Sequence, residues 1–233
     1  MAFRGYDIMP VHSTDIPLRM PQLRARAILF DMDGTLVDST VKVEQLWHKW
    51  CAMHDIDPAR VMAIQHGARS SDTMRAVAPH LDIAKESAWM DASEAADCEG
   101  VVEVRGARAL VAQVPAERWT IATSAGRSTA LARLAHCAIP IPPTMVCADD
   151  VRAGKPDPEI YRMAASRLGF DAAECLVFED APAGVASALA AGCTVVQVGG
   201  SAPFDARVQL VLPDLTGIRV VMLEKSLEIV FPG

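Results

Sequence analysis

Apolar residues along the chain follow two alternating patterns. Short apolar runs that end in polar residues are typical of buried strands in a parallel sheet, whereas apolar residues three and four positions apart indicate amphipathic helices. The run at 28–30 reads as a first, central strand. Similar runs rich in β-branched residues predict further strands at 119–124, 144–149, 175–180 and 193–198.

Helical segments separate most of these strands. Roughly ten or more residues with helical patterning lie between neighbouring runs. This alternation predicts an α/β fold, with a doubly wound and mostly parallel sheet that carries helices on its faces. Sheets of this kind bind ligands in the crevice beyond the carboxyl ends of their strands, so the polar residues there are the first candidates for a functional site.

A long helical block interrupts the alternation after the first strand. It starts with an apolar stripe at Val43, Leu46, Trp47, Trp50 and Cys51 and continues through alanine-rich, mixed-charge sequence up to about residue 98. Gly67 and Pro79 interrupt the pattern, which predicts several short helices instead of one long helix. We expect this block to form an all-helical cap over the crevice.

The pattern divides the chain into a core, a cap and an arm. The core comprises residues 24–40 and 103–233, the cap residues 41–102, and the arm residues 1–23. Three prolines in the arm favour irregular structure. The arm contains no apolar segment typical of a secretion signal, and no window of the chain approaches eighteen apolar residues, so we expect a cytoplasmic protein that does not span a membrane.

Composition narrows the choice of partners. The chain has 233 residues, of which 51% are hydrophobic, and a formal net charge of -7. This acidic balance argues against binding of a nucleic-acid backbone, which requires a basic surface. The six cysteines are scattered without a C-x-x-C pair, so we expect small core residues in a reducing compartment. The oligomeric state is left open.

Two aspartates follow the first strand directly. Asp31 and Asp33 belong to the string FDMDGTLVDS, and a spacing of two places both side chains on one face if the extended geometry persists. Carboxylates so close repel each other, so the pair indicates a metal ion, a shared proton or an acid-base role. A solvated turn is the alternative, because Asp and Gly are common in turns.

The ends of other strands contribute further polar groups. Thr123 and Ser124 end one run, Glu179 and Asp180 end another, and Lys155 lies in the loop AGKPDP. With the two aspartates, they place four carboxylates, two hydroxyls and one ammonium at one sheet edge. Such a cluster requires an added cation. Oxygen ligands without nearby His or Cys favour Mg²⁺.

These residues have the order and spacing of the haloacid dehalogenase superfamily of phosphatases. FDMDGTLVDS resembles the first motif of that family, IATS the second, the lysine of GKPDPEIY the third and VFEDAPAG the fourth. The likeness covers roughly residues 24–200. It implies a Rossmann-like core with, in this subgroup, a helical cap inserted after the first motif, in agreement with the layout derived from the hydrophobic pattern.

The resemblance also implies catalytic roles. Asp31 would attack phosphorus and form an aspartyl-phosphate, and Asp33 would protonate the leaving alcohol and then deprotonate water. Thr123 and Ser124, with backbone amides, would hold the phosphate oxygens. Lys155 would neutralise these oxygens and restrain Asp31.

The metal ligands are implied in the same way. Mg²⁺ would be held by the Asp31 side chain, the backbone carbonyl of Asp33 and the Asp180 side chain. Glu179 would be a further ligand or would support the ligands from behind. Alternatively, its charge only favours the N-terminus of the helix that begins near Pro182.

A loop in the cap gives an indication of the substrate. In HGARSSDTMRAVAPH, residues 66–80, the pair His66-Gly67 breaks the helical pattern and permits a tight loop. If this loop faces the crevice, Arg69 can reach a phosphate or hydroxyls with its several donors; otherwise it is a surface arginine. The string is similar to the cap loop of glycerol-phosphate and 2-deoxyglucose-6-phosphate phosphatases, which implies that His66, Gly67 and Arg69 contact the substrate.

We therefore expect Mg²⁺-dependent hydrolysis of a small phosphate monoester, such as a sugar or polyol phosphate. A β-phosphoglucomutase-like transferase is the alternative within the family, although that subgroup carries a histidine where this chain has Val43. A related phosphonate hydrolase uses a cap lysine in the region where this chain has Asp72, and dehalogenases lack the second aspartate. A binding protein without catalysis is the alternative from another class.

Overall fold

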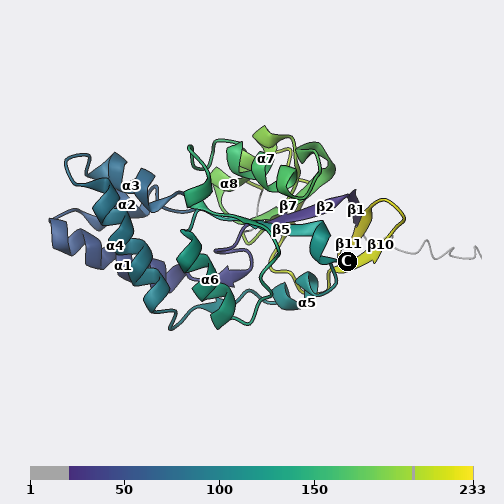
Figure 1. The fold of residues 1–233 in the computed structure, drawn as a ribbon, viewed down its shortest axis with the longest axis horizontal. Helices are drawn as coiled ribbons and strands as arrows, with labels where there is room; N and C mark the ends of the chain where they lie inside the picture. Colours follow the sequence, from purple (N-terminus) through teal and green to yellow (C-terminus); the bar gives the residue numbers. More distant parts are fainter. Residues whose placement is uncertain (1–20, 201–202, 233) are drawn as a thin grey trace, which may run out of the picture.

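A six-stranded parallel sheet forms the centre of the molecule (Figure 1). The structure is a computed structural model that describes residues 21–200 and 203–232. The strand order is β6-β5-β2-β7-β8-β9, which confirms the predicted doubly wound α/β class. β9 was not predicted from the sequence. The strands are β2 (Ala27–Phe30), β5 (Trp119–Ala122), β6 (Met145–Val146), β7 (Cys175–Glu179), β8 (Thr194–Val198) and β9 (Leu210–Leu212).

Helices cover both faces of this sheet. In Figure 1, α7 (Glu159–Arg167) and α8 (Pro182–Ala191) lie over one face, and α5 (Ala107–Val111) and α6 (Arg127–His136) lie under the other. Successive side chains of a strand point to opposite faces. Phe30 and Phe178 therefore join the cluster that includes α5 and α6, and Leu29 and Val177 join the cluster that includes α7 and α8. Short 3₁₀ helices occur at Ala116–Arg118, Ala148–Asp150 and Ala172–Glu174.

A helical block lies at one end of the sheet (Figure 1). It has a hydrophobic cluster of its own that includes Trp47, Trp50, Met74 and Met90, as the apolar stripe suggests. The block lies where the sequence predicts the cap, and we call it the cap below. Its helices are α1 (Thr40–His54), α2 (Pro58–Met62), α3 (Ser70–Val77) and α4 (Ile83–Ala96), between the paired strands β3 (Val37–Asp38) and β4 (Val102–Glu103).

A small antiparallel sheet brings the two ends of the described chain together. Its order is β1-β11-β10, formed by β1 (Gln22–Ala25), β11 (Leu227–Val230) and β10 (Arg219–Met222). The predicted irregular arm, 1–23, is therefore wrong at its last two residues, because pairing with β11 makes them a strand. Residues 1–20 of that arm lie outside the described residues.

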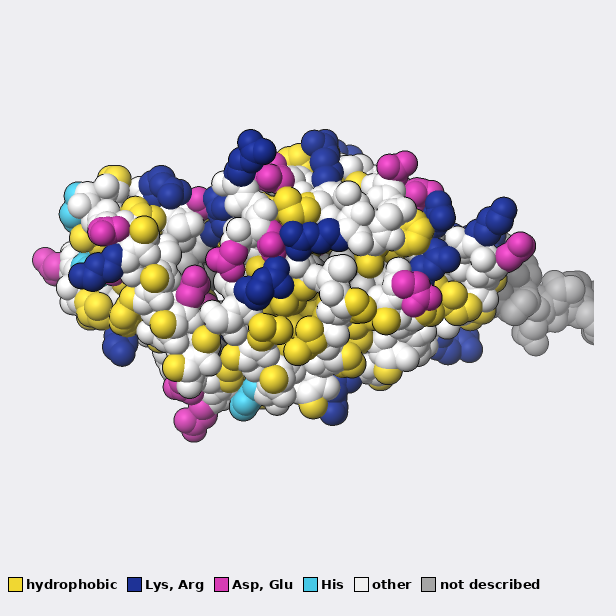
Figure 2. Space-filling model, in the orientation of Figure 1, with side chains coloured by type: hydrophobic (Ala, Val, Ile, Leu, Met, Phe, Trp, Pro, Cys, Tyr) yellow, Lys and Arg dark blue, Asp and Glu magenta, His cyan; other side chains and the backbone are white. Residues whose placement is uncertain are grey.

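The surface and the cysteines agree with the composition. All six cysteines are free, and four of them are buried. Figure 2 shows Lys and Arg side chains interspersed with Asp and Glu side chains on the face in view. In the part of the chain that the structure describes, no helix has the length and apolar character needed to cross a membrane.

Candidate active site

The register of the parallel strands brings the predicted polar residues to one edge of the sheet. Phe30 of β2 is level with Ile121 of β5 and with Phe178 of β7. The chains therefore leave the sheet together, and Asp31 comes to lie beside Glu179. The backbone N–H of Asp31 still donates to the carbonyl of Phe178 at 3.0 Å, which fixes where this carboxylate starts.

Lys155 brings a positive charge into the middle of the acidic residues. Its Nζ lies 2.5 Å from Asp31 Oδ1 and 2.6 Å from Glu179 Oε1, and its side chain is fully buried. The ammonium also lies 5.1 Å from the centre of the Tyr161 ring, at cation-π distance. Burial disfavours the charged amine, but the two carboxylates outweigh it and raise the pKa of Lys155. This residue therefore stays charged.

Negative charge still exceeds positive charge around Asp31. Burial raises the pKa of Asp31, the Lys155 charge opposes this rise, and Glu179 and Asp180 add to it. A further cation beside these carboxylates would favour the ionised form of Asp31. One oxygen from each of Asp31, Glu179 and Asp180 lies within 4.8 Å of the others. Hard oxygen donors in such a cluster suit Mg²⁺.

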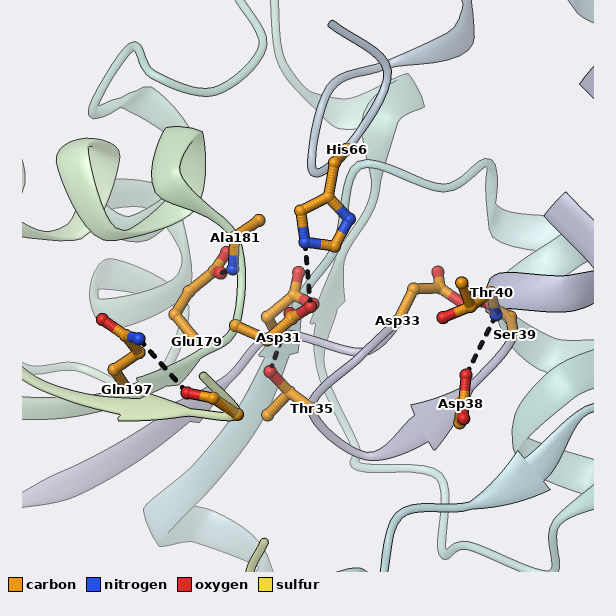
Figure 3. Close-up of polar contacts among 12 residues, drawn as sticks. Asp31, Asp33, Thr35, Asp38, Ser39, Thr40, His66, Glu179, Ala181 and Gln197 are labelled. Atoms are coloured by element: carbon orange, nitrogen blue, oxygen red, sulfur yellow. Dashed lines mark hydrogen bonds and ion pairs between the residues drawn. The ribbon is translucent and has the colours of Figure 1, made fainter. Parts of the chain in front are cut away.

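The Asp180 side chain lies close to the backbone of the turn after β2 and to the cap. Its Oδ1 accepts a hydrogen bond from Thr35 Oγ1 at 3.2 Å, and its Oδ2 lies 3.3 Å from His66 Nε2 of the cap (Figure 3). Burial raises the pKa of Asp180, and His66 opposes the rise. A Cβ at Gly34 would lie 1.8 Å from Asp180 Oδ2, and φ at Gly34 is +90°, so the turn after β2 requires glycine here.

Glu179 is held by three donors. It is fully buried and accepts hydrogen bonds from Lys155 Nζ at 2.6 Å, from the Tyr161 hydroxyl at 3.0 Å and from the backbone N–H of Ala181 at 2.8 Å. A Cβ at Gly184 of α8 would lie 1.5 Å from Glu179 Oε1. The contacts give this carboxylate a clear structural role, which is to hold Lys155.

Asp33 has partners of its own. Its Oδ1 accepts hydrogen bonds from Ser39 Oγ at 2.7 Å and from Arg133 Nη1 at 2.7 Å. Figure 3 shows the Asp33 carboxylate directed toward Ser39 and away from Asp31. Both aspartates line the same cavity, as their spacing suggests, but they do not form a close carboxylate pair. Asp33 is paired with Arg133 instead of with Asp31.

A cavity of about 90 Å³ lies between the cap and the sheet edge. Thr123 accepts a hydrogen bond at Oγ1 from the backbone N–H of Ala125 at 3.0 Å, and Ser124 Oγ donates to the carbonyl of Gly67 at 2.8 Å. The second bond ties the segment that follows β5 to the predicted cap loop. The predicted site residues among those that line the cavity are Asp31, Asp33, Thr123, Ser124, His66 and Gly67.

Arg69 lies outside this cavity. Its Nε and Nη2 donate to Asp72 at 2.7 and 3.0 Å, and its Nη1 and Nη2 donate to the carbonyls of Val151 and Arg152 at 3.1 and 3.2 Å. The guanidinium therefore joins the cap to the loop that carries Lys155. The structure shows no contact between Arg69 and the cavity, so its predicted contact with a substrate stays a prediction.

Several residues at the site were not found from the sequence pattern. Arg133, Glu94 and Ser39 line the cavity, and Tyr161 lies beneath Lys155. One signal was present for Arg133, because a charged residue stands in the buried stripe of α6 among Thr129, Ala130 and Leu134. No comparable signal marks Tyr161, which occupies an ordinary buried position of α7.

Comparisons with known proteins agree on one family. The family model described as haloacid dehalogenase-like hydrolase matches residues 25–192. Hexitol phosphatase A of Escherichia coli is 40% identical over 85% of this chain and 95% of its own length. The 2-deoxyglucose-6-phosphate phosphatase 2 of Saccharomyces cerevisiae is 32% identical over 87% of this chain and 93% of its own length. A crystal structure of a hydrolase from Pseudomonas syringae, 26% identical, superposes with a TM-score of 0.71 over 81% of this chain and 94% of that chain.

Proposed function

The chain belongs to the haloacid dehalogenase-like hydrolase family, and we propose that it hydrolyses small phosphate monoesters of sugars or polyols through an aspartyl-phosphate on Asp31. One observation carries the proposal. Asp31 lies 2.5 Å from a buried lysine and within a cluster of three carboxylates, beside the cavity under the cap. A carboxylate in this setting can be ionised and positioned as a nucleophile.

The first step transfers the phosphoryl group to the protein. An Asp31 carboxylate oxygen bonds to phosphorus as the bond from phosphorus to the ester oxygen breaks, and Asp33 gives its proton to the departing alkoxide. In the second step, water attacks phosphorus, Asp33 takes the proton from that water, and the acyl-phosphate bond breaks. Asp31 is thereby restored and inorganic phosphate is released.

Charge stabilisation is the other contribution of the site. Lys155, fully buried against Asp31, can neutralise oxygens of the transferring group without the reorganisation that water would need. The Asp31 side chain, the Asp33 carbonyl and the Asp180 side chain would hold Mg²⁺, whose positive charge would offset the repulsion between nucleophile and phosphate. Thr123 and nearby backbone amides then orient the phosphate.

Similarity to two phosphatases supports a small polyhydroxylated substrate. The two curated relatives named above are, by their names, a hexitol phosphatase and a 2-deoxyglucose-6-phosphate phosphatase. The cavity of about 90 Å³ is below the roughly 300–1,000 Å³ usual for ligand pockets. A sugar phosphate would therefore enter when the cap moves away from the sheet edge, and His66 and Gly67 would face it once the cap returns.

The test is a panel of phosphate monoesters assayed for phosphate release with Mg²⁺ and after chelation. The panel contains hexitol phosphates, glycerol phosphates, 2-deoxyglucose 6-phosphate and β-glucose 1-phosphate. We expect release from one or more of the first three, loss of release after chelation with recovery on adding Mg²⁺, and a loss of about 10³-fold or more in Asp31→Asn. Isomer formation from β-glucose 1-phosphate without release would instead indicate a mutase.

A further inference from the structure

Arg133 is a buried charge that the roles above do not use. It lies in the inward stripe of α6 and is 2% exposed, yet it carries a guanidinium that cannot lose its proton. Burial opposes its charge, but Asp33 and Glu94 outweigh burial and raise the pKa of Arg133. An ion at such a position is usually no more stabilising than well-packed apolar residues, so stability alone is a poor reason for it.

The contacts of Arg133 join the cap to Asp33. Nη1 donates to Asp33 Oδ1 at 2.7 Å, and Nη2 lies 3.1 Å from Oε1 of Glu94, a buried residue on α4 of the cap. Among the described residues, the hydrogen bonds received by Asp33 end on Oδ1, one from Arg133 and one from Ser39. Oδ2 is therefore the oxygen that can carry a proton toward a substrate.

The remaining donors of Arg133 argue against a purely structural role. Nε is buried and makes no hydrogen bond within the described chain, and the contact of Nη2 is the ion pair with Glu94 Oε1 at 3.1 Å. Buried donors that serve stability are normally satisfied. The packing of α4 on α6 also has another polar tie, because Thr129 Oγ1 donates to the carbonyl of Asp91 at 3.2 Å. The two helices do not need this arginine to be joined.

We propose that Arg133, held by Glu94 of the cap, is a positioning residue that orients Asp33 for proton transfer. The proposal rests on the proposed function and adds to it a pair of residues that acts only while α4 of the cap lies against α6. The guanidinium binds one oxygen of Asp33 and leaves the other to give its proton to the ester oxygen, and later to accept a proton from water. Arg133 itself exchanges no proton.

Substrates with different leaving groups distinguish a role of Arg133 in proton transfer from a purely structural role. An alkoxide is a poor leaving group and needs the proton from Asp33, whereas p-nitrophenolate is stable and leaves without it. The value of kcat/KM reports phosphoryl transfer up to its first irreversible step, so it shows the need for that proton directly. The experiment measures kcat/KM for the best alkyl phosphate of the panel and for p-nitrophenyl phosphate.

The variants are Arg133→Lys, Arg133→Met and Glu94→Gln, with Arg127→Lys as the control on the same helix. Arg127 pairs with Asp150 at 2.6 Å and does not line the cavity. We expect the ratio of kcat/KM for the alkyl ester to that for the aryl ester to fall at least about tenfold in Arg133→Met. A smaller fall is expected in Arg133→Lys and Glu94→Gln, and none in Arg127→Lys.

Each other outcome has a distinct meaning. An equal loss on both esters would show that Arg133 only maintains the structure, and a higher KM with unchanged kcat would show that it binds substrate; both overturn the proposal. Unchanged kinetics in Arg133→Met and Glu94→Gln would overturn it as well. Activity toward the aryl ester shows that a variant is folded. If the unsubstituted protein releases phosphate from neither ester, the proposed function itself fails.

Discussion

Lys155 determines which charges the site can hold. With Asp31 and Glu179 at 2.5 and 2.6 Å, one ammonium is shared between two buried carboxylates. Removing it would leave two unpaired negative charges in a low-dielectric environment, which is far more costly than losing a surface ion pair. Glu179 in turn is fixed by Tyr161 and the N–H of Ala181, so groups that do not line the cavity help to set the position of the ammonium.

Substitution of Gly184 tests the packing of helix α8 against the Glu179 carboxylate. In a helix interior, Gly→Ala normally stabilises by up to about 1 kcal/mol. At Gly184, a Cβ would meet the Glu179 carboxylate at 1.5 Å. We therefore expect Gly184→Ala to destabilise the protein by about 1–3 kcal/mol, measured by urea unfolding, and to lower kcat because Glu179 and Lys155 move.

The matched control is Gly184→Ala in a protein that lacks the Glu179 carboxylate. In a Glu179→Ala background the added methyl group has room, so Gly184→Ala should cost little further stability there. A stabilising effect of Gly184→Ala in the unsubstituted protein would show that Glu179 does not occupy the position described.

At the scale of elements, the parallel register explains why distant residues meet. β2, β5 and β7 are neighbours in the sheet, so residues about 90 and 150 positions apart along the chain leave it at one edge. The cap is joined to this edge through two segments, the loop at His66-Gly67 and helix α4. The loop is held by Ser124 and, through Arg69, by the segment that leads to Lys155.

Substitution of Arg69 tests whether this junction between the cap and the Lys155 loop is needed for turnover. We expect Arg69→Ala to lower kcat/KM for the panel substrates by about 5- to 50-fold, because the cap loses its hydrogen bonds to the carbonyls of Val151 and Arg152. Arg75→Ala is the matched control, since Arg75 also pairs with Asp72, at 2.9 Å, but is exposed and bonds neither carbonyl. Kinetics of Arg69→Ala equal to those of the control would show that the junction is not needed for turnover.

The site residues found from the sequence share one property. Asp31, Asp33, Thr123 and Asp180 stand at or just after the ends of short apolar runs, so strand patterning locates them, whereas Lys155 was added from the loop AGKPDP. Arg133 and Tyr161 could not be assigned roles in this way. Their partners lie 100 and 18 positions away, on other elements, and only the packing of α6 and α7 against the sheet brings them together.

The limits of the sequence pattern at the element level have the same origin. The pattern predicted the parallel strands that precede polar residues, but it did not predict β9 or the small sheet β1-β11-β10. The first two residues of β1, Gln22 and Leu23, lie in the predicted arm directly after Pro21, and the strand is stabilised by pairing with β11 from the far end of the chain. Such non-local pairing leaves no local pattern in the sequence.

At the scale of the whole molecule, the buried charges between cap and core make stability depend on pH. Burial raises the pKa of Glu94 from 4.5 to about 7, against the attraction of Arg133. A carboxyl whose folded pKa is raised contributes stability that is full below its unfolded value and is lost as pH rises through the folded value. Between pH 4.5 and 7 the loss is at most about 3 kcal/mol.

Glu94→Gln should remove this dependence, because the amide resembles the protonated carboxyl. We expect the variant and the unsubstituted protein to have similar free energies of unfolding at pH 4.5, and the variant to be more stable by about 1–3 kcal/mol at pH 8. Denaturant unfolding of both proteins at a series of pH values measures the difference. A variant less stable at pH 8 would show that the ion pair with Arg133 outweighs burial. A stabilised variant with weaker proton transfer would show that Glu94 serves function at a cost in stability.

The central claim is that Asp31 accepts the phosphoryl group, and its most direct test is to trap that group. In Asp33→Asn with p-nitrophenyl phosphate and Mg²⁺, the first transfer needs no proton donor, but the second step lacks its base. We expect a burst of about one nitrophenolate per molecule, followed by slow turnover, and an acid-quenched peptide carrying one phosphoryl group on Asp31. No burst, or a phosphoryl group on any other residue, would contradict the account.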